Sequence, residues 1–219
     1  MISNILVILA AGMGIRYGTE VPKQFTLLLG KEVLRIVLET MIPSEFTDRI
    51  IVVLDNEERM KLVKTEYDVD VILGGKDRAH SFQNALSYIN NSYKDATKVI
   101  FHEAARPLVS SEVIDTYFTL LNQYDYVETC QEITDSLGSY ILESPKREDF
   151  YLIQAPEAYR INILNKFFDC DSSIYFAANQ FPKECKGYRY FNVPNNIKLT
   201  KPEDKYLIEF LLKQQSNDI

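Results

Sequence analysis

The stretch LAAGMGIRYGTEVPKQF, residues Leu9–Phe25, follows an apolar run and carries the glycines and cations from which the rest of the chain is best interpreted. That run, Asn4–Gly12, reads NILVILAAG, which predicts a strand buried on both faces, as in a parallel sheet. Three of the eight glycines of the chain fall within the stretch: Gly12, Gly14 and Gly18. Glycine permits positive φ and close approach of backbone N–H groups to a ligand, while Arg16 and Lys23 carry charge suited to phosphate. The stretch therefore indicates a phosphate-binding loop, with a plain tight turn and solvated cations as the alternative.

The glycine spacing does not fit the two best-known phosphate-binding motifs. Tyr17 stands where the third glycine of GxGxxG would fall, and no GK[ST] follows as a P-loop requires. Asp55 is the only candidate for the acid that a dinucleotide-binding fold places after its second strand. A Rossmann dehydrogenase is therefore the weakest interpretation of this chain.

Beyond the first loop, apolar runs alternate with segments of helical periodicity. Strands are predicted at 4–12, 48–55, 69–75 and 97–107, and helices at 31–42, 56–67, 77–89 and 110–124. Later segments predict a helix at 160–170, a strand at 188–193 and a closing helix at 201–215. The alternation predicts an α/β fold with a Rossmann-like, doubly wound, mostly parallel sheet, in a single domain spanning 1–219.

Three of the first four predicted strands end in a polar or glycine-rich phrase. These phrases are AAGMGIR at 10–16, GGKDR at 74–78 and HEAARP at 102–107. In parallel sheets of this kind, ligands bind beyond the carboxyl ends of the strands. We therefore expect the three loops to converge on one site.

The alternation loosens after residue 124, where short alternating runs are broken by turn residues. This pattern predicts a protruding β-arm at about 128–159. An isolated two-stranded hairpin is marginally stable in water, so the arm needs another surface to pack against. The arm of a second copy, related by a twofold axis, is the simplest such surface. The chain is therefore predicted to form a homodimer.

Composition narrows the possible partners. The net charge of −7 disfavours a nucleic-acid polymer, and 46% hydrophobic with 25% charged residues is the usual mixture for a soluble domain. The three cysteines lack CxxC spacing and accompany two histidines, so neither a disulfide framework nor a zinc site is predicted. No apolar run reaches the length of a membrane span, and the apolar start lacks a basic leader region. We expect a cytoplasmic protein with no membrane partner.

Taken together, the phrases resemble one family. LAAGMGIRYG…PKQF is similar to the nucleotidyltransferase signature LAAGxGxRxG…PKQ. The resemblance continues in family order through GGKDRAHSF at 74–82, HEAARP at 102–107, TDS at 134–136, QAPEAY at 154–159 and NNIKLTKPED at 195–204. The chain thus resembles the cytidylyltransferase family that includes the 2-C-methyl-D-erythritol 4-phosphate and ribitol 5-phosphate enzymes.

The resemblance implies an enzyme that transfers CMP from CTP to a small alcohol phosphate and releases pyrophosphate, with Mg²⁺ or another divalent cation as cofactor. It implies that Arg16, Lys23 and Lys198 neutralise the phosphates during the reaction, with Lys198 on the α-phosphate. The implied nucleotide-binding residues are Leu9, Ala10, Ala11, Gly12, Met13, Gly14, Gly75, Lys76, Arg78, Ser81 and Ala104. Among these, Ala10, Ala11, Gly75 and Ser81 are implied to hold the cytosine.

The resemblance also implies acceptor-binding residues: Glu103, Arg106, Asp135, Ser136 and Arg147. Glu103 stands where the family usually has an aspartate, and it is the implied metal ligand. The alternative for Arg106 is a structural ion pair instead of a substrate contact. The alternative for Arg147 is an exposed arginine in a turn, with no role in phosphate binding. Asp135, Ser136 and Arg147 lie on the predicted arm, from which family members reach the acceptor phosphate of the neighbouring subunit.

The clearest departure from the family pattern lies at 172–181, SSIYFAANQF, where many relatives carry a Thr-Asp-Asp/Glu phrase. The acids of that phrase are absent here, unless Asp169 or Asp171 substitutes for them. An aromatic, acid-free phrase favours a different acceptor, such as ribitol 5-phosphate or another alditol phosphate used in a surface polymer. Methylerythritol phosphate in isoprenoid synthesis is the first alternative. A non-catalytic nucleotide-binding relative is the second, which the retention of Arg16, Lys23 and Lys198 disfavours.

Overall fold

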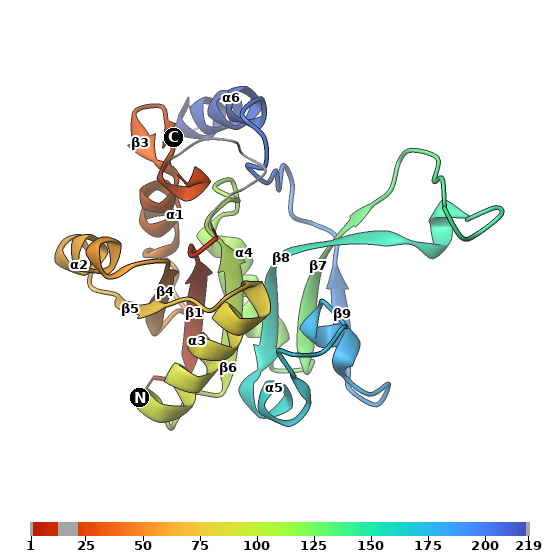
Figure 1. Ribbon diagram of the computed structural model, residues 1–219, viewed down its shortest axis with the longest axis horizontal. Helices are drawn as coiled ribbons and strands as arrows, with labels where there is room; N and C mark the ends of the chain where they lie inside the picture. The colour runs from red at the N-terminus through yellow and green to blue at the C-terminus, as the bar shows by residue number, and fades with distance from the viewer. Residues whose placement is uncertain (1, 13–21, 218–219) are drawn as a thin grey trace.

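A computed structural model describes residues 2–12 and 22–217, which form a seven-stranded sheet with helices on both faces (Figure 1). The strands of this sheet are β1 Asn4–Leu9, β4 Arg49–Leu54, β5 Asp70–Leu73, β6 Lys98–Glu103, β7 Tyr126–Glu132, β8 Tyr151–Arg160 and β9 Gly187–Tyr190. The helices are α1 Val33–Met41, α2 Glu57–Glu66, α3 Arg78–Ser92, α4 Ser111–Leu120, α5 Ile161–Phe167 and α6 Asp204–Asn217. The predicted α/β class is confirmed.

The first strand is apolar throughout because both of its faces are covered. Leu6 and Ile8 pack with residues of α1 and α4, whereas Ile5 and Val7 pack with residues of α3 and α5 on the other face. All four side chains are fully buried. An alternating pattern would have left one face in water, so the continuous apolar run at 5–8 is what a strand covered on both faces requires.

The strand order is β5-β4-β1-β6-β8-β7-β9. Strands β5, β4, β1 and β6 are mutually parallel, and β8 is inserted antiparallel between β6 and β7. The chain winds outward from β1 to β5 and then returns through α3 to β6 on the other side of β1. The carboxyl ends of β1 and β6 therefore flank the point where the winding reverses, which is where ligands bind in open sheets of this kind.

Two helix starts carry side-chain caps, and one helix start differs from the prediction. Asn56 and Asp77 cap α2 and α3 by accepting bonds from backbone N–H groups. The helix predicted from residue 31 begins at Val33, because residues 31–32 form strand β3, Lys31–Glu32, which pairs with β2, Leu27–Leu28. Helical periodicity at 33–41 did not reveal this small hairpin.

The predicted arm projects from one side of the sheet (Figure 1). Strand β9 pairs with β7 over Tyr126–Thr129, and β6 pairs with β8 as far as Glu157. The β7–β8 register shifts at Glu128/Thr129. Beyond Thr129, β7 and β8 pair only with each other and continue into the loop at 133–150, which contains the short helix η3, Arg147–Asp149. The range predicted for the arm, 128–159, thus includes strand residues of the main sheet as well as the projecting part.

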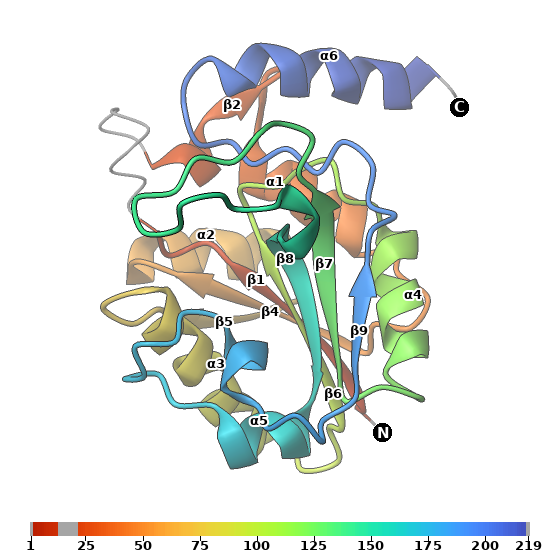
Figure 2. The ribbon, with the colours of Figure 1, turned by 90° about the vertical axis from the view of Figure 1, so that its right-hand side faces the viewer.

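Helix α6 packs against the β2–β3 hairpin at one end of the molecule (Figure 2). Its Ile208 is buried in a cluster with Leu28, Val33 and Leu199. This packing brings the segment before α6 back to the first loops of the chain. Within the described residues, no helix is both long enough and apolar enough to span a membrane.

Candidate active site

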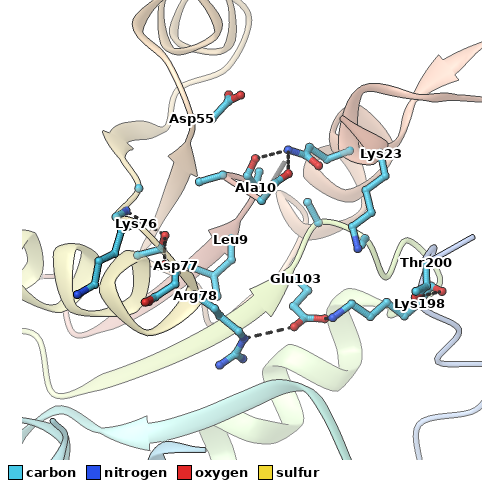
Figure 3. Close-up of a pocket in the computed structure, with 18 of the residues that line it drawn as sticks. Leu9, Ala10, Lys23, Asp55, Lys76, Asp77, Arg78, Glu103, Lys198 and Thr200 are labelled. Carbon is cyan, nitrogen blue, oxygen red and sulfur yellow. Dashed lines mark hydrogen bonds and ion pairs between the residues drawn. The ribbon is translucent and has the colours of Figure 1, made fainter. Parts of the chain in front are cut away.

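A cavity of about 580 Å³ opens at the carboxyl ends of β1, β4, β5 and β6, at the predicted position. Loops from both ends of the chain line it (Figure 3). The lining residues are Leu9, Ala10, Ala11, Gly12, Lys23, Gln24, Asp55, Gly74, Gly75, Lys76, Asp77, Arg78, Ser81, Glu103, Ala104, Ala105, Tyr175, Lys198 and Thr200.

The buried amide of Gln24 shapes the loop that follows β1. Its Nε2 donates to the carbonyl oxygens of Ala10 and Gly12, at 2.7 and 2.9 Å. The N–H of Ala10 donates to the carbonyl of Val53 at 2.9 Å. Both backbone groups of Ala10 are therefore engaged within the protein, so this residue contributes mainly a fixed wall to the cavity. The next described residue of the loop is Pro22, which leads into η2, Lys23–Phe25.

The loop between β5 and α3 is built on glycines because its backbone lies against the neighbouring loop. A Cβ at Gly74 would lie 2.4 Å from the Ala11 Cβ and 2.9 Å from the Ser81 hydroxyl, so only glycine fits without displacement. The Ser81 hydroxyl accepts from the Gly75 N–H at 3.0 Å and donates to the Asp77 carbonyl at 2.8 Å. Ser81 thus holds the loop in shape, which the sequence alone did not indicate.

Glu103, at the end of β6, is surrounded by cations. Its carboxylate lies 2.7 Å from the Lys198 amino group, 3.3 Å from Arg78 Nε and 3.3 Å from Arg106 Nε. Burial alone would raise the pKa of this carboxyl, but Lys198, Arg78 and Arg106 together lower it to about 2. Lys23 and Lys198 enter the cavity from two different segments, as Figure 3 shows. The cavity thus holds several cations in an otherwise acidic chain.

Arg78 connects the cavity to the interior of the sheet. It is paired with Glu157, a β8 residue that is 1% exposed, and the Tyr159 hydroxyl donates to the other oxygen of Glu157. Burial alone would lower the pKa of Arg78, but Glu157 and Glu103 raise it. Arg78 therefore stays charged at the edge of the cavity.

Arg106 is a structural residue in this arrangement. Besides Glu103, it donates to the backbone carbonyl of Asn196 at 2.8 Å, and it does not line the cavity. This contact orients the segment that carries Lys198. His102 is fully buried, and burial lowers its pKa to about 4. Its Nε2 donates to the carbonyl of Arg106 at 3.1 Å, so His102 is a neutral internal residue rather than a base.

The acid-free segment 172–181 forms part of the cavity wall. Tyr175 lines the cavity, and the rings of Tyr175 and Phe176 lie 5.9 and 5.7 Å from the Arg78 guanidinium carbon. Cations within about 6 Å of an aromatic face are attracted to it. An aromatic pair thus stands beside Arg78.

Most of the predicted nucleotide-binding and catalytic residues meet in the cavity. Those that line it are Leu9, Ala10, Ala11, Gly12, Lys23, Gly75, Lys76, Arg78, Ser81, Ala104 and Lys198, together with Glu103 from the acceptor set. Met13, Gly14 and Arg16 lie outside the described residues. The roles assigned to these residues remain predictions.

The remaining acceptor-binding predictions, Asp135, Ser136 and Arg147, lie on the arm and do not line the cavity. Arg147 is about half exposed, and it donates to the carbonyl of Thr134 at 2.6 Å. Within the described part of the chain, nothing places these three side chains near Glu103. Their predicted role toward the acceptor of a neighbouring subunit remains a prediction.

Several lining residues were missed. Gln24 lies in the stretch Leu9–Phe25, and its position next to Lys23 was the available signal. Asp77 is the N-cap of α3, directly after the glycine pair at 74–75. Asp55 also lines the cavity, but the sequence suggested it only as the acidic residue that follows the second strand of a dinucleotide-binding fold. Tyr175 and Thr200 had no local signal, because their place in the cavity depends on contacts between distant segments.

A doubly wound sheet whose winding reverses at a glycine-rich cavity lined by lysines defines a nucleotide-binding transferase of the α/β class. The family model for 2-C-methyl-D-erythritol 4-phosphate cytidylyltransferase, IspD, matches residues 4–214. The chain belongs to this family of enzymes, and the resemblance noted in the sequence is confirmed.

The relatives extend this match over nearly the whole chain. A 2-C-methyl-D-erythritol 4-phosphate cytidylyltransferase of Thermosipho melanesiensis is 32% identical over 94% of this chain and 96% of its own length. The bifunctional ribulose 5-phosphate reductase/CDP-ribitol pyrophosphorylase Bcs1 of Haemophilus influenzae is 30% identical over 98% of this chain, which spans only 49% of that protein. The 4-diphosphocytidyl-2C-methyl-D-erythritol synthase structure from Anaerococcus prevotii superimposes with a TM-score of 0.80 at 22% identity, covering 96% of each chain, and shows the same fold.

Proposed function

We propose that this cytidylyltransferase transfers CMP from CTP to a small alditol phosphate of the ribitol 5-phosphate type, giving a CDP-alcohol and pyrophosphate. The observation that carries the choice of acceptor is the aromatic wall: Tyr175, from the acid-free segment 172–181, lines the cavity beside Arg78. The similarity to Bcs1, whose name includes CDP-ribitol pyrophosphorylase, supports this choice. A role in surface-polymer synthesis is part of the same proposal.

The reaction needs positioned charge rather than a covalent nucleophile. An oxygen of the acceptor phosphate attacks the α-phosphorus of CTP in line, and the bond from that phosphorus to the bridging oxygen of pyrophosphate breaks. Lys23 and Lys198 lower the repulsion between the two polyanions and stabilise the charge on the pentacoordinate phosphorus. Arg16 has the same role in the proposal. The acceptor phosphate is already ionised at neutral pH, which fits the absence of a titratable base at His102.

Glu103 keeps Lys198 in place before CTP arrives. The two groups are 2.7 Å apart, and Arg106 fixes the adjoining segment through Asn196. A triphosphate competes with Glu103 for the Lys198 amino group, because both are anionic. Lys198 is therefore positioned by Glu103 in the free enzyme and turns toward the α-phosphate in the complex.

The base is placed, in this proposal, against the part of the cavity wall formed by Ala11, Gly75 and Ser81. Ala11 and Gly74 pack too closely to admit a group between them, and Ser81 fixes the Gly75 N–H, so this wall is rigid. Backbone groups held in fixed positions can distinguish the amino group of cytosine from the oxygen of uracil. We therefore include cytosine selectivity in the proposal.

A divalent cation, Mg²⁺ or a similar ion, is part of the proposed reaction, and it would lower the negative charge of the triphosphate. Glu103 is the residue predicted to reach it. Both carboxylate oxygens of Glu103 already face Lys198, Arg78 or Arg106, so Glu103 fits direct coordination of the ion poorly. The phosphate oxygens of the nucleotide are the better ligands, and no step above depends on the ion.

The proposal also includes a homodimer in which each arm completes the site of the other copy. In the loop of the arm, Tyr140 and Ile141 are almost fully exposed to water and Leu142 is about half exposed. Arg147 stands on the same projection with a guanidinium suited to phosphate. Pairing of two arms would bury the apolar loop and bring Arg147 of one copy to the acceptor in the other.

Methylerythritol phosphate is the alternative acceptor. The family model and the Thermosipho melanesiensis relative both carry that compound in their names, and the same cavity could accept either phosphate. The two acceptors differ in chain length and branching, so the wall containing Tyr175 is the place where they would be distinguished.

Pyrophosphate release decides between the acceptors. The purified chain is mixed with CTP, Mg²⁺ and one acceptor at a time: ribitol 5-phosphate, glycerol 3-phosphate, other alditol phosphates or methylerythritol phosphate. We expect the highest kcat/KM with ribitol 5-phosphate or a close alditol phosphate. A higher value with methylerythritol phosphate would overturn the choice of acceptor, and no release with any member of the panel would overturn the catalytic proposal in favour of a nucleotide-binding relative.

A further inference from the structure

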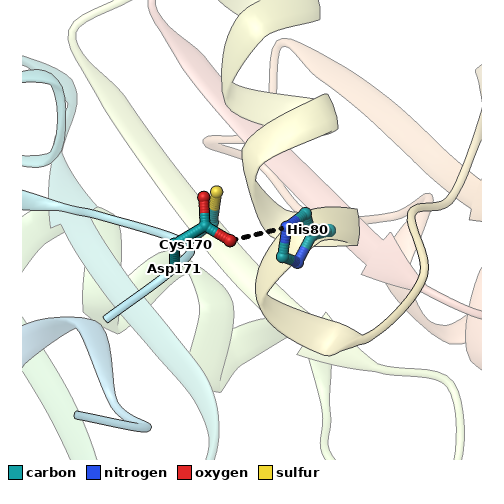
Figure 4. A group of neighbouring side chains, drawn as sticks. All are labelled: His80, Cys170 and Asp171. Atoms are coloured by element: carbon teal, nitrogen blue, oxygen red, sulfur yellow. Dashed lines mark ion pairs between the residues drawn. The ribbon is translucent and has the colours of Figure 1, made fainter. Parts of the chain in front are cut away.

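A cluster of metal-ligating side chains lies outside the cavity, between α3 and the turn at 169–172 (Figure 4). It consists of His80, Cys170 and Asp171. One ligand atom of each lies within 4.8 Å of the others. The predicted absence of a zinc motif reflects sequence spacing only, because residues 80 and 170 meet through the fold and not through a short motif.

The hydrogen bonds of His80 show which ring nitrogen can bind a metal. Nδ1 lies 2.8 Å from the Asp77 carboxylate. An ionised carboxylate only accepts hydrogen bonds, so Nδ1 carries the hydrogen and, in the neutral ring, Nε2 keeps its lone pair. This is the carboxylate–histidine arrangement that orients histidine ligands in metal sites.

The other side of the ring faces a second acceptor. Nε2 lies 3.3 Å from the Asp171 carboxylate, so with a neutral ring two lone pairs point at each other. A metal cation between the two atoms would turn this contact into an attraction. The Cys170 sulfur lies at the same place, where it could serve as a third ligand.

We propose that His80 Nε2, the Cys170 thiolate and the Asp171 carboxylate bind one Zn²⁺ ion, with Asp77 orienting the histidine and a fourth position open to water. Nitrogen, sulfur and oxygen ligands of this kind suit Zn²⁺ and do not suit Mg²⁺. Ligand atoms around a tetrahedral Zn²⁺ lie about 3.3–3.7 Å apart, so the cluster has to close by about an ångström. Asp171 is 74% exposed, and its side chain is free to make this movement.

The site is distinct from the CTP cavity but adjacent to it. Lys76 and Asp77 line the cavity, and the Lys76 amino group lies 3.6 Å from the Asp171 carboxylate. Zn²⁺ takes the place of this ammonium group at Asp171 and frees Lys76 to turn toward the cavity. The ion also ties α3 to the segment that leads to Tyr175, and it therefore fixes the position of the aromatic wall.

Cobalt binding tests the proposal without an activity measurement. The purified full chain is stripped with a chelator and titrated with Co²⁺, which gives an intense near-ultraviolet thiolate-to-cobalt absorption band when it is bound to cysteine. We expect the band to saturate at one equivalent, to disappear when Zn²⁺ is added, and to persist in excess Mg²⁺.

Matched variants assign the band. Cys170→Ser removes it, whereas Cys185→Ser, at another partly exposed cysteine, leaves it unchanged. Asp171→Asn and Asp77→Asn keep the band but weaken Co²⁺ binding, the latter by about 10- to 100-fold, as expected for a group that orients a ligand. Circular dichroism confirms that each variant is folded.

Three outcomes overturn the proposal: no thiolate band in the unchanged chain, a band that survives Cys170→Ser, or a band lost equally in Cys185→Ser. In the first case the contact between His80 and Asp171 is an ordinary ion pair with a doubly protonated ring. Because the readout is metal binding, it is independent of which acceptor phosphate the enzyme uses.

Discussion

At the scale of single residues, the most constrained group is the Glu103 carboxylate. Three cations face it, and together they outweigh the effect of burial on its pKa. Replacing one of these cations still leaves two, so the carboxylate does not become a lone buried charge. This arrangement allows Lys198 to be removed without unfolding the chain.

Lys23→Ala and Lys198→Ala should each lower kcat by roughly 10²–10³, the loss typical of removing one group that stabilises transition-state charge. Thermal unfolding should change little, since both side chains end in an open cavity. Lys201→Ala is the control, because Lys201 is an exposed lysine close to Lys198 that does not line the cavity. Near-normal kcat in either cavity variant removes that lysine from the catalytic set.

Glu128 is a buried carboxyl with an expected effect on stability. It is 3% exposed, and its Oε1 has no hydrogen-bond partner within the described part of the structure. Burial raises its pKa, Arg189 on β9 opposes this shift, and Glu157 on β8 adds to it. Because the folded pKa is raised, its contribution to stability is complete below the unfolded pKa and is lost as the pH rises through the folded value.

Glu128→Gln should therefore become more stable relative to the unchanged chain as the pH rises from about 5 to about 8. Gln has nearly the same shape and cannot ionise. Urea unfolding of both proteins across this range measures the difference. A difference that stays constant with pH shows that Glu128 does not change its ionisation state in this window.

At the scale of elements, sequence patterns predicted the strands and loops of the first half well. Each strand of that half is a short apolar run whose loop follows at once, and the family resemblance named Gly75 and Ser81 in one of these loops, where both line the cavity. The wall formed by Tyr175 was not predicted, because its contact with Arg78 joins positions nearly a hundred residues apart and leaves no periodic trace in either segment. The small hairpin of β2 and β3 was missed for a similar reason, as two-residue strands have no pattern of their own.

The segment 172–181 should control acceptor choice. Tyr175→Ala removes the ring beside Arg78, and we expect the ratio of kcat/KM for ribitol 5-phosphate to that for methylerythritol phosphate to fall by about 10-fold, the effect of losing one good pocket contact. Tyr175→Phe keeps the ring and should retain the ratio unless the hydroxyl contacts the acceptor. An unchanged ratio in both variants would falsify the assignment of this wall to the acceptor.

At the scale of the whole molecule, the cavity and the arm are separate: within a single chain, the predicted acceptor-binding residues of the arm do not line the cavity. The cavity collects residues from both ends of the chain, whereas Asp135, Ser136 and Arg147 belong to the arm and do not line the cavity. Sequence analysis predicted both sets through the family resemblance, but only the first set meets in one chain. The proposal that a second copy completes the acceptor site rests on this separation.

Mixing two inactive variants tests this relation. Arg147→Ala should raise the KM for the acceptor phosphate and leave CTP affinity nearly unchanged, and Lys23→Ala should abolish turnover. After subunit exchange, a heterodimer of the two has one site with both residues intact, so activity should exceed the sum of the separate proteins.

Two measurements accompany the mixing experiment. Light scattering should give the mass of a dimer, and Lys146→Ala, next to Arg147 and equally exposed, should behave like the unchanged chain. If exchange is confirmed and the mixture shows no gain, Arg147 does not act across the interface.

The return of the chain from α5 to the cavity has a consequence for biosynthesis. The ribosome delivers the first loop and Glu103 long before Lys198, which reaches Glu103 only when the backbone of Leu199 bonds to the carbonyl of Ala105 at 2.8 Å. Until then a nascent chain can pair its central strands, yet it lacks Lys198, the lysine that the proposed mechanism places on the α-phosphate. A polypeptide that ends before residue 198 should therefore show the same roughly 10²–10³ loss of turnover that is expected for Lys198→Ala.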